Sequence, residues 1–469
     1  MRMETHAVLD AARTREIIAG ARELLAKTGM KVTGTELNRE LSALGAFQKK
    51  GERWLISEKQ FDSFVEAYRK RPLPPPHSRF VGEASFYSCY LRDPHSGKVT
   101  ETTTNSLRKA AVFSEKAAAQ YPLSPVVPGY PTDVPGELSS LMRYKLALEC
   151  CSQDVIPTPD ALFASDYMFA MAKAAHKTMD RLPVYPISPL TLGSDSAEIV
   201  LRHKDKLKSF YVFTMPFMGI TAPMHITMGY AQALAETVGS AILMEAVTGL
   251  PADIRPNLDP VDLKRFNIAF GTPLKFFLEQ AGYELLSALR EEPVPFSSVN
   301  IHTFAKECDC RAAAEKGMLM LSGALCGAKK FYCVGTLCLD ELFDPLQLLW
   351  DLEMLQYVKR LLDGPPADRM EDTFLQEVQE GLSGGFSCSD RTLDDYKEYL
   401  ELPAVCETMN WRSWVSGGEK GTLALLREKY DEIDAQPCHY QLDQAVQREL
   451  DAIYAQADAH WKEIQAEAH

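Results

Sequence analysis

After Pro122 the sequence alternates between short apolar runs and longer helical runs, and this alternation restricts the fold more than any other feature. The short runs are rich in β-branched and aromatic residues, as buried strands are, and a stretch with helical periodicity follows each one. Eight such pairs over roughly 280 residues are what a (β/α)₈ barrel requires. The expected strands lie near residues 124–129, 153–157, 183–188, 209–215, 251–256, 293–299, 328–334 and 384–388, and the expected helices at 135–149, 161–178, 194–207, 224–248, 273–290, 309–325, 340–363 and 390–402.

A doubly wound open sheet is the alternative fold for the same alternation. Such sheets commonly carry a Gly-rich phosphate-binding turn after their first strand. No such turn follows residues 124–129. We therefore predict an α/β protein whose strands form a TIM barrel.

Two further regions flank the expected barrel. Thr35 and Ser57 suit the N-caps of helices, and "FQKKGERWLI" predicts a hairpin. "SRFVGEASFYSCYLRDPHSGKVTE" predicts a strand pair around a Pro/Gly turn, and a helix is expected at 104–118. The three expected regions are an N-terminal helical and hairpin region, residues 1–120; the barrel, residues 121–402; and a C-terminal helical extension, residues 403–469.

Charge and cysteine content limit the partners and the compartment. The formal net charge of −14 disfavours nucleic acid and anionic membrane surfaces, since both require a basic face. Eleven cysteines, with Cys150 and Cys151 adjacent, do not resemble the disulfide framework of a secreted protein. The N-terminus "MRMETHAVLDAARTREIIAG" has no apolar signal core. We expect a cytoplasmic protein with reduced thiols.

Residues 211–236 form an apolar, Met-rich stretch that contains no charged residue before Glu236. Its length suits a membrane span. However, Pro216 and Pro223 interrupt a helix, and polar groups such as His225 lack partners in lipid. A strand, a tight loop and a buried helix fit the stretch better.

In a barrel, the loop 216–223 lies at the carboxyl end of its strand, where barrel enzymes place their chemistry. The following helix start favours an anion, and aromatic faces hold quaternary ammonium groups. The stretch thus suits a zwitterion that carries an ammonium and a carboxylate, although apolar residues at a strand end also suit an ordinary core. The expected aromatic wall consists of Tyr211, Phe213, Phe217 and Tyr332, of which strand alternation lets only some face inward.

Polar residues near the same strand ends are candidates for the carboxylate end of such a ligand. His225 opens the helix after the loop, and Asn300 and His302 end the sixth strand. Asp340 follows the seventh strand, where it also suits the negative start of a helix. Gly219 and Thr221 supply the small and polar positions of the loop itself.

Zinc is a separate possibility at "HTFAKECDC", which offers His302, Cys308 and Cys310. The spacing matches none of the C-x-x-C pair sets that structural zinc sites use, and Cys308 and Cys310 point to opposed sides of a helix start. We therefore assign no metal to this chain and no acid or base to its chemistry.

The segment "PFMGITAPMHITMGYAQALAE" resembles the trimethylamine methyltransferase (MttB-like) family, in which a G-x-T-A-P loop precedes a long helix. "VVPGYPTDVP", "ISPL", "FGTP" and "WRSWVSGGEKGTLALLREKYDEI" resemble further segments of that family in the same order. The resemblance implies a barrel enzyme that moves a methyl group from a methylated amine to the cobalt of a corrinoid carried by a separate protein.

Family members that use trimethylamine carry pyrrolysine after the seventh strand. The corresponding segment here, "FYCVGTLCLDELFD", contains only ordinary residues, as in relatives that resemble betaine demethylases. "CSDRTL" departs from the His-rich segment that relatives often show. The resemblance implies a methyltransferase that takes a methyl group from a small quaternary amine, and we expect the chain to form a homo-oligomer. An O- or S-methyl donor, or a betaine-binding protein without catalysis, remain alternatives.

Overall fold

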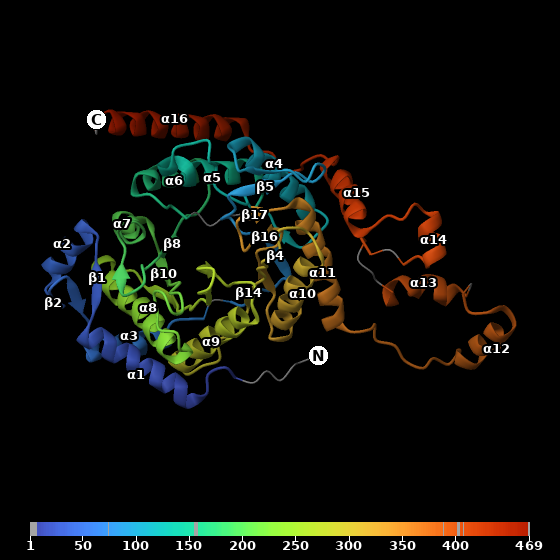
Figure 1. The fold of residues 1–469 in the computed structure, drawn as a ribbon, viewed down its shortest axis with the longest axis horizontal. Helices are drawn as coiled ribbons and strands as arrows, with labels where there is room; N and C mark the ends of the chain where they lie inside the picture. Colours follow the sequence, from blue (N-terminus) through green and yellow to red (C-terminus); the bar gives the residue numbers. More distant parts are fainter. Residues whose placement is uncertain are drawn as a thin grey trace.

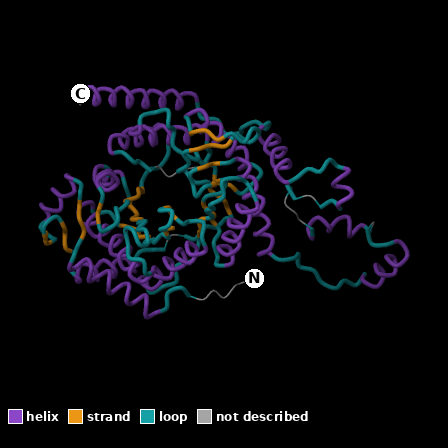
Figure 2. Tube along the Cα trace, viewed as in Figure 1, coloured by secondary structure: helices purple, strands orange, loops and turns teal. Residues whose placement is uncertain are grey.

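The computed structural model describes residues 7–73, 75–153, 158–387, 389–400, 404–406 and 408–467. Short strands lie around a common centre and helices lie outside them (Figures 1 and 2). The helices preceding and following the strands are α1 (Ala11–Lys27), α2 (Thr35–Leu44), α3 (Glu58–Arg69), α4 (Thr104–Ala118), α5 (Gly136–Cys150), α6 (Leu162–Ala174), α7 (Ser194–Arg202), α8 (Ile226–Thr248), α9 (Pro273–Arg290), α10 (Cys310–Leu325), α11 (Pro345–Asp363), α12 (Phe374–Gly384), α13 (Asp390–Tyr399), α14 (Trp411–Ser416), α15 (Thr422–Asp434) and α16 (Gln444–Glu467).

Two parallel sheets carry the strands that face this centre. One has the order β11-β10-β8 and the other β14-β15-β4-β7. A helix follows each of β7, β8, β10, β11, β14 and β15 along the chain, as in repeated βαβ units. The mixed α/β class is therefore confirmed. The strands are β4 (Val81–Glu83), β7 (Leu123–Ser124), β8 (Arg181–Val184), β10 (Ser209–Phe213), β11 (Ala252–Arg255), β14 (Ser298–Asn300) and β15 (Lys330–Tyr332).

One of the expected strands differs from the structure. The prediction at 384–388 is wrong, because α12 continues to Gly384 and a turn follows it. Instead β4 pairs with both β15 and β7. Its middle residue is Gly82, where an added Cβ would lie 3.0 Å from Val334, so a larger side chain does not fit. The strand expected at 153–157 falls mostly outside the described residues.

The N-terminal region packs against the outside of α8. Gly239 allows this close approach, since an added Cβ there would lie 2.8 Å from both Leu25 and Met30. The expected hairpin forms between β2 (Gln48–Lys50) and β3 (Arg53–Leu55), and β3 also pairs with β1 (Met30–Val32). These elements share one large apolar core with α8 and α9.

Smaller strands cover the ends of the parallel sheets. The expected pair around the Pro/Gly turn forms between β5 and β6, and the chain after β15 folds back into β16 and β17, which joins β5. β12 and β13 form a hairpin after β11. The bounds are β5 (Tyr90–Arg92), β6 (Val99–Glu101), β9 (Thr191–Leu192), β12 (Val261–Asp262), β13 (Asn267–Ile268), β16 (Thr336–Leu337) and β17 (Leu342–Phe343).

The C-terminal helices differ in how they pack. α15 lies against α11, with Leu426 and Ile433 buried, and α16 crosses α5 and α6 at the top of Figure 1. By contrast, α12, α13 and α14 stand away from the rest of the chain (Figure 1). None of the described helices has the length and apolar content that a membrane crossing requires.

Candidate active site

Side chains alternate between two faces along the parallel strands. Phe210 and Val212 of β10 are fully buried toward the helices, whereas Tyr211 and Phe213 are half-buried on the opposite, inner face. Val299 and Phe331 are buried in the same way, which leaves their neighbours on the inner face. Four predicted site residues thus share the inner face of the sheets, namely Tyr211, Phe213, Asn300 and Tyr332.

Tyrosine rings from three neighbouring strand ends gather near Tyr211. The hydroxyl of Tyr185, which directly follows β8, donates a hydrogen bond to Tyr211. Tyr87 follows β4 and Tyr130 follows β7, and their ring centroids lie 6.4 Å apart. Phe86 packs against Tyr87 at 4.5 Å. These five residues form what we call the aromatic lining.

Two groups of the candidate site are exposed to solvent although many protein atoms surround them. The side chain of Tyr87 is 50% exposed. Nevertheless, surrounding protein atoms and the neighbouring Tyr130 raise its pKa above the ordinary value. Asp160 is likewise exposed while desolvation raises the pKa of its carboxyl. Both groups are thus open to solvent on one side and surrounded by protein atoms on the other.

Charged groups border the aromatic lining on two sides. The guanidinium of Arg143 lies over the rings of Phe86, at 4.6 Å, and Tyr130, at 5.0 Å. The Tyr130 hydroxyl donates to the Asp160 carboxylate. Across the lining, the guanidinium of Arg181 lies 5.1 Å from the ring centroid of Tyr211. The positive charges of Arg181 and Arg255 partly offset the effect of burial on the pKa of Tyr211.

Phe217 begins the tight loop that the sequence predicted after β10. Its carbonyl oxygen accepts from the backbone N–H groups of Ile220, Thr221 and Ala222. Gly219 has a φ of 78°, which favours glycine, and its N–H donates to the carbonyl of Ala222 at 2.8 Å. The Thr221 hydroxyl accepts from the N–H of Phe217 at 2.8 Å. Gly219 and Thr221 therefore determine the shape of this loop.

His225 and Asn300 have different surroundings in the structure. His225 is exposed at the N-cap position of α8, and its side chain makes no capping bond. Asn300 is tied to Glu279, since its side-chain amide donates to that carboxylate at 2.6 Å. Lys275 lies 3.4 Å from Glu279 and 2.5 Å from Asp259, both buried. Asn300 thus borders a buried ion cluster.

His302 lies at the end of β14 and is 6% exposed. Its Nε2 lies 3.2 Å from Cys333 Sγ, and its Nδ1 has no hydrogen-bond partner among the described residues. Its ring packs on Phe270 with centroids 4.8 Å apart. Burial, and the positive charges of Lys275 and Lys316, lower the pKa of His302 to about 3. The imidazole is therefore neutral at neutral pH.

Asp340 lies in the turn between β16 and β17. The helix expected from residue 340 begins later, at Pro345, where Asp344 caps it. The Asp340 carbonyl accepts from Ser88 Oγ at 3.0 Å. Burial and the neighbouring Glu341 raise the pKa of the Asp340 carboxyl. Asp340 is thus part of a structured turn beside β5.

The two cysteines considered as zinc ligands, Cys308 and Cys310, differ in their burial. Cys308 is half-buried, and burial raises its pKa to about 12, whereas Cys310 is exposed at the start of α10. Within the described ranges, no group of three or more His, Cys, Asp or Glu side chains is placed to hold a metal ion.

Sequence reasoning missed several residues of the lining. Tyr185 follows its strand immediately, and an aromatic residue at a strand end could have been predicted as part of the site. Phe86 and Tyr87 fell in a segment predicted as a strand pair, which hid their place after β4. The missed residues are Phe86, Tyr87, Tyr130, Arg143, Asp160 and Tyr185.

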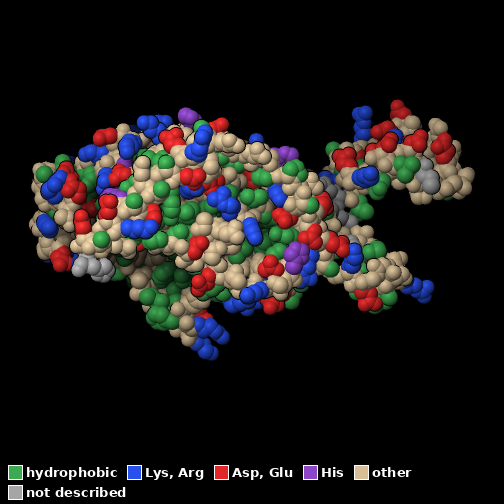
Figure 3. Space-filling view, turned by 90° about the horizontal axis from the view of Figure 1, so that it is seen from above, with side chains coloured by type: hydrophobic (Ala, Val, Ile, Leu, Met, Phe, Trp, Pro, Cys, Tyr) green, Lys and Arg blue, Asp and Glu red, His purple; other side chains and the backbone are tan. Residues whose placement is uncertain are grey.

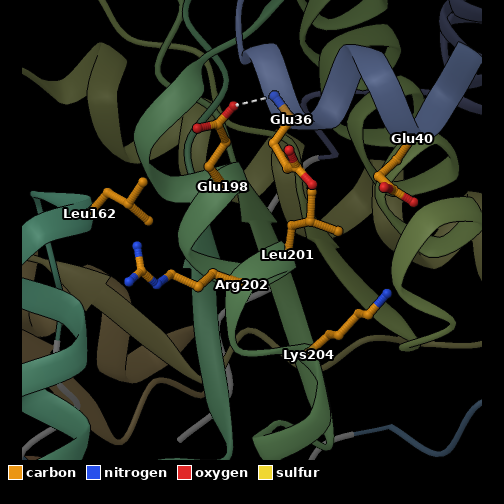
Figure 4. A pocket seen from close by; sticks show the side chains of 7 residues that line it. All are labelled: Glu36, Glu40, Leu162, Glu198, Leu201, Arg202 and Lys204. Carbon is orange, nitrogen blue, oxygen red and sulfur yellow. Dashed lines mark hydrogen bonds between the residues drawn. The ribbon is translucent and has the colours of Figure 1, made fainter.

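A different pocket, of about 430 Å³, lies on the outside of the molecule (Figure 4). It is formed by α2, α7 and the start of α6, where the Glu198 carboxylate accepts from the N–H of Glu36 at 3.1 Å. Both acidic and basic side chains surround it. Because it lies on helices outside the strands, it is separate from the candidate site.

Known proteins resemble this chain over much of its length. The sequence profile described as trimethylamine methyltransferase matches residues 158–461. Trimethylamine methyltransferases of Methanosarcina mazei and Methanosarcina barkeri are 24% identical over 293 residues and 23% identical over 288 residues. The first alignment covers 62% of this chain and 58% of the relative, and the second covers 61% and 57%. This chain thus spans less than two thirds of these relatives.

A monomethylamine methyltransferase of Methanosarcina barkeri has a solved structure with a TM-score of 0.43 and 12% identity, covering 92% of this chain and 96% of that one. The profile match covers more than half of the residues and includes β8 through α15, while Phe86, Tyr87, Tyr130 and Arg143 lie before it. The chain belongs to the trimethylamine methyltransferase family.

Proposed function

We propose that this chain is an enzyme that transfers a methyl group from a small, betaine-type quaternary amine to the Co(I) corrinoid of a cognate corrinoid protein. The observation that carries the proposal is the aromatic lining, which brings five aromatic rings together at the strand ends, with the Asp160 carboxylate beside Tyr130. Membership in the trimethylamine methyltransferase family supports methyl transfer from an amine. The betaine class follows from the chemistry of the lining.

The scaffold of this site is a (β/α)₈ barrel in our proposal. The order β14-β15-β4-β7 supports it, because β4 joins the last strand of the series to the first. The order β11-β10-β8 supplies the opposite side. Figure 2 shows these strands around one centre, with helices outside. The aromatic lining then occupies the carboxyl ends of the strands, where barrel enzymes bind substrates.

Tyr87 and Tyr185 of the aromatic lining would hold the ammonium end of the substrate, because the guanidinium groups of Arg143 and Arg181 already lie over Phe86, Tyr130 and Tyr211. Each aromatic face in contact with a quaternary ammonium contributes roughly 0.5–2 kcal/mol. Asp160 lies beside Tyr130 and adds a negative charge in its ionised form. The carboxylate end would face Arg255, which is exposed. Its positive charge acts to lower the pKa of both Tyr211 and Tyr332 and so reaches the inner face of the sheets. A zwitterion therefore matches both ends of the site.

The chemistry requires little from the protein beyond orientation. The C–N bond breaks with both electrons on nitrogen, so a neutral tertiary amine leaves and needs no proton from an acid. The corrinoid supplies the electron pair that accepts the methyl group. The lining positions the ammonium and excludes water, and rings stabilise the cation with less ground-state attraction than a full charge pair would provide. A neutral His302 is consistent with this proton-free reaction.

The corrinoid protein would dock where exposed apolar side chains surround the candidate site. Ile187 follows β8 and is 59% exposed. Met215 and Ile220 are exposed after β10, and Met224 and Met228 are exposed at the start of α8. Methionine-rich exposed surfaces are common at protein-binding sites, because the side chain adapts to its partner.

The test is methyl transfer by the purified protein to reduced cobalamin or to its corrinoid protein, followed by absorbance. The substrates are glycine betaine, proline betaine, carnitine and γ-butyrobetaine, with trimethylamine and a methylated thiol as comparisons. We expect turnover with a betaine and none with the thiol. Turnover with the thiol alone would contradict the donor class. Betaine binding by calorimetry without any turnover would indicate a binding protein instead.

A further inference from the structure

We call residues 365–403 the arm, and its described residues, 365–387 and 389–400, leave the body after α11. Gly364 ends α11 with a φ of 79°, and Pro365 and Pro366 follow it. Consecutive prolines cannot continue the helix, so they direct the chain away from the body. The arm contains α12 and α13, and Figures 1 and 3 show the chain projecting there.

The arm has no core of its own. None of the described side chains of α12 or α13 is buried. Arg391 pairs with Glu371 at 3.1 Å and Glu377 at 3.0 Å, and the Tyr399 hydroxyl donates to Asp368 at 2.9 Å. Exposed ion pairs of this kind contribute roughly 0–1 kcal/mol each. Helices as short as these require apolar packing to be stable in water.

The arm nevertheless carries a large apolar surface. Phe374, Leu375 and Leu382 lie on one side of α12, and Leu393, Tyr396 and Leu400 recur at helical spacing along α13. At roughly 100 Å² for each exposed large side chain, the set offers about 900 Å², close to the roughly 800 Å² that each partner buries in a standard interface. Its members are Met370, Phe374, Leu375, Leu382, Phe386, Leu393, Tyr396, Tyr399 and Leu400, between 46% and 80% exposed.

Exposed apolar side chains also lie on α10 and α11, the adjacent helices of the body from which the arm leaves. Tyr357 and Leu361 are one helical turn apart on α11, 44% and 51% exposed. Met318 of the adjacent α10 is 69% exposed. The arm of the same chain leaves these side chains uncovered. One copy thus presents both an apolar arm and an apolar patch. In a two-fold dimer, the arm of each copy can bury the patch of the other.

The geometry points to a second copy of this chain as the partner of the arm: we infer a dimer in which each arm packs on the α10–α11 patch of the other copy. The candidate site does not share this surface. α11 begins beside the strand ends, and its 19 residues carry the chain about 28 Å before the arm starts. A corrinoid protein docked over the candidate site would therefore occupy the opposite end of α11.

The charge of the arm favours the patch over a second arm as its contact. The arm contains ten acidic and three basic residues, a formal net charge of −7. Two arms placed side by side would repel each other, because like charges destabilise a contact. The α10–α11 patch is mainly apolar at Met318, Tyr357 and Leu361. Exchange of arms between copies therefore separates the two acidic segments.

The test is the mass of the full chain by sedimentation equilibrium. We expect wild type to be a dimer and the double variant Leu375→Asp/Leu382→Asp to dissociate at least tenfold more readily. Leu44→Asp is the matched control, because Leu44 is also an exposed leucine, 47% exposed, at the end of α2. This control should remain dimeric. A monomeric wild type, or a double variant that assembles like wild type, would overturn the inference.

Hydrogen exchange on wild type gives a second measurement that needs no variant. Amides of α12 and α13 should exchange at least tenfold more slowly in concentrated than in dilute protein, while those of α1 should not change. Exchange in α12 and α13 that is independent of concentration would contradict the dimer. Protection that arises only when the corrinoid protein is added would assign the arm to that partner instead.

Discussion

Tyr87 has the most exposed ring of the aromatic lining, and its removal tests that lining directly. We expect Tyr87→Ala to lower kcat/KM for the betaine about tenfold, since one cation–π contact contributes up to about 2 kcal/mol. Tyr87→Phe keeps the ring and should retain most activity. Tyr90→Ala is the control, because Tyr90 is a nearby exposed tyrosine outside the lining. Equal activity of Tyr87→Ala and Tyr90→Ala would refute a role for Tyr87.

His302 predicts how stability depends on pH. Its pKa is about 3 in the folded protein, against about 6.5 in an unfolded chain. Between these values the unfolded chain binds a proton that the folded protein does not, so the free energy of unfolding decreases as pH falls from about 6.5 toward 3. His302→Gln should reduce this dependence in urea titrations at several pH values. The exposed His225→Gln should leave it unchanged, and identical curves for all three proteins would refute the assignment.

For single residues, the sequence predicted that side chains alternate between the two faces of each strand. It indicated that only some of Tyr211, Phe213 and Tyr332 face inward, and the structure places all three on the inner face. The place of Tyr87 and Tyr130 in the aromatic lining could not be predicted, because both lie in loops whose positions depend on which strands are neighbours. Likewise, the sequence could not show that the Thr221 hydroxyl binds the backbone of its own loop.

The chain after β15 is held by one buried ion pair. Lys316 Nζ lies 2.5 Å from Asp351 and donates to the carbonyls of Cys333 and Thr336. Lys316→Met leaves Asp351 buried and unpaired, which should cost about 3–5 kcal/mol of unfolding free energy. Urea unfolding measures this loss. Lys359→Met, at the exposed pair with Asp363, should cost less than about 1 kcal/mol.

A second substitution separates the ion pair from general damage to the core. Lys316→Met/Asp351→Leu removes both charges and should recover part of the stability lost in Lys316→Met. A double variant less stable than Lys316→Met, or a Lys359→Met variant equally unstable, would show that the pair does not hold this segment.

Elements with strong periodicity were predicted closely. The helices α4 and α9 match their expected bounds, because caps and turn residues delimit them. The strand β4 was missed, because three residues around a glycine give no period. The strand predicted at 384–388 was wrong, since its two glycines and single phenylalanine favour a turn as much as a strand. A strand of only a few residues is determined by the strands that pair with it, and its own sequence does not predict it.

Across the whole molecule, the sequence predicted the α/β class from the number and order of its alternations. It gave no indication that α12 and α13 bury none of their described side chains, because their helical periodicity resembles that of packed helices. An amphipathic pattern shows that a helix has an apolar side, but not which surface covers it. The arm, the aromatic lining and the apolar surface around it therefore emerge only from the three-dimensional arrangement.

The most direct test of the central claim follows the methyl group itself. Glycine betaine labelled with trideuterated N-methyl groups is incubated with the protein and reduced cobalamin, and both products are analysed by mass spectrometry. Our account predicts trideuteromethyl cobalamin and dimethylglycine that retains two labelled methyl groups, in equal amounts. Labelled betaine recovered intact, in a protein that transfers methyl groups from another donor, would contradict it.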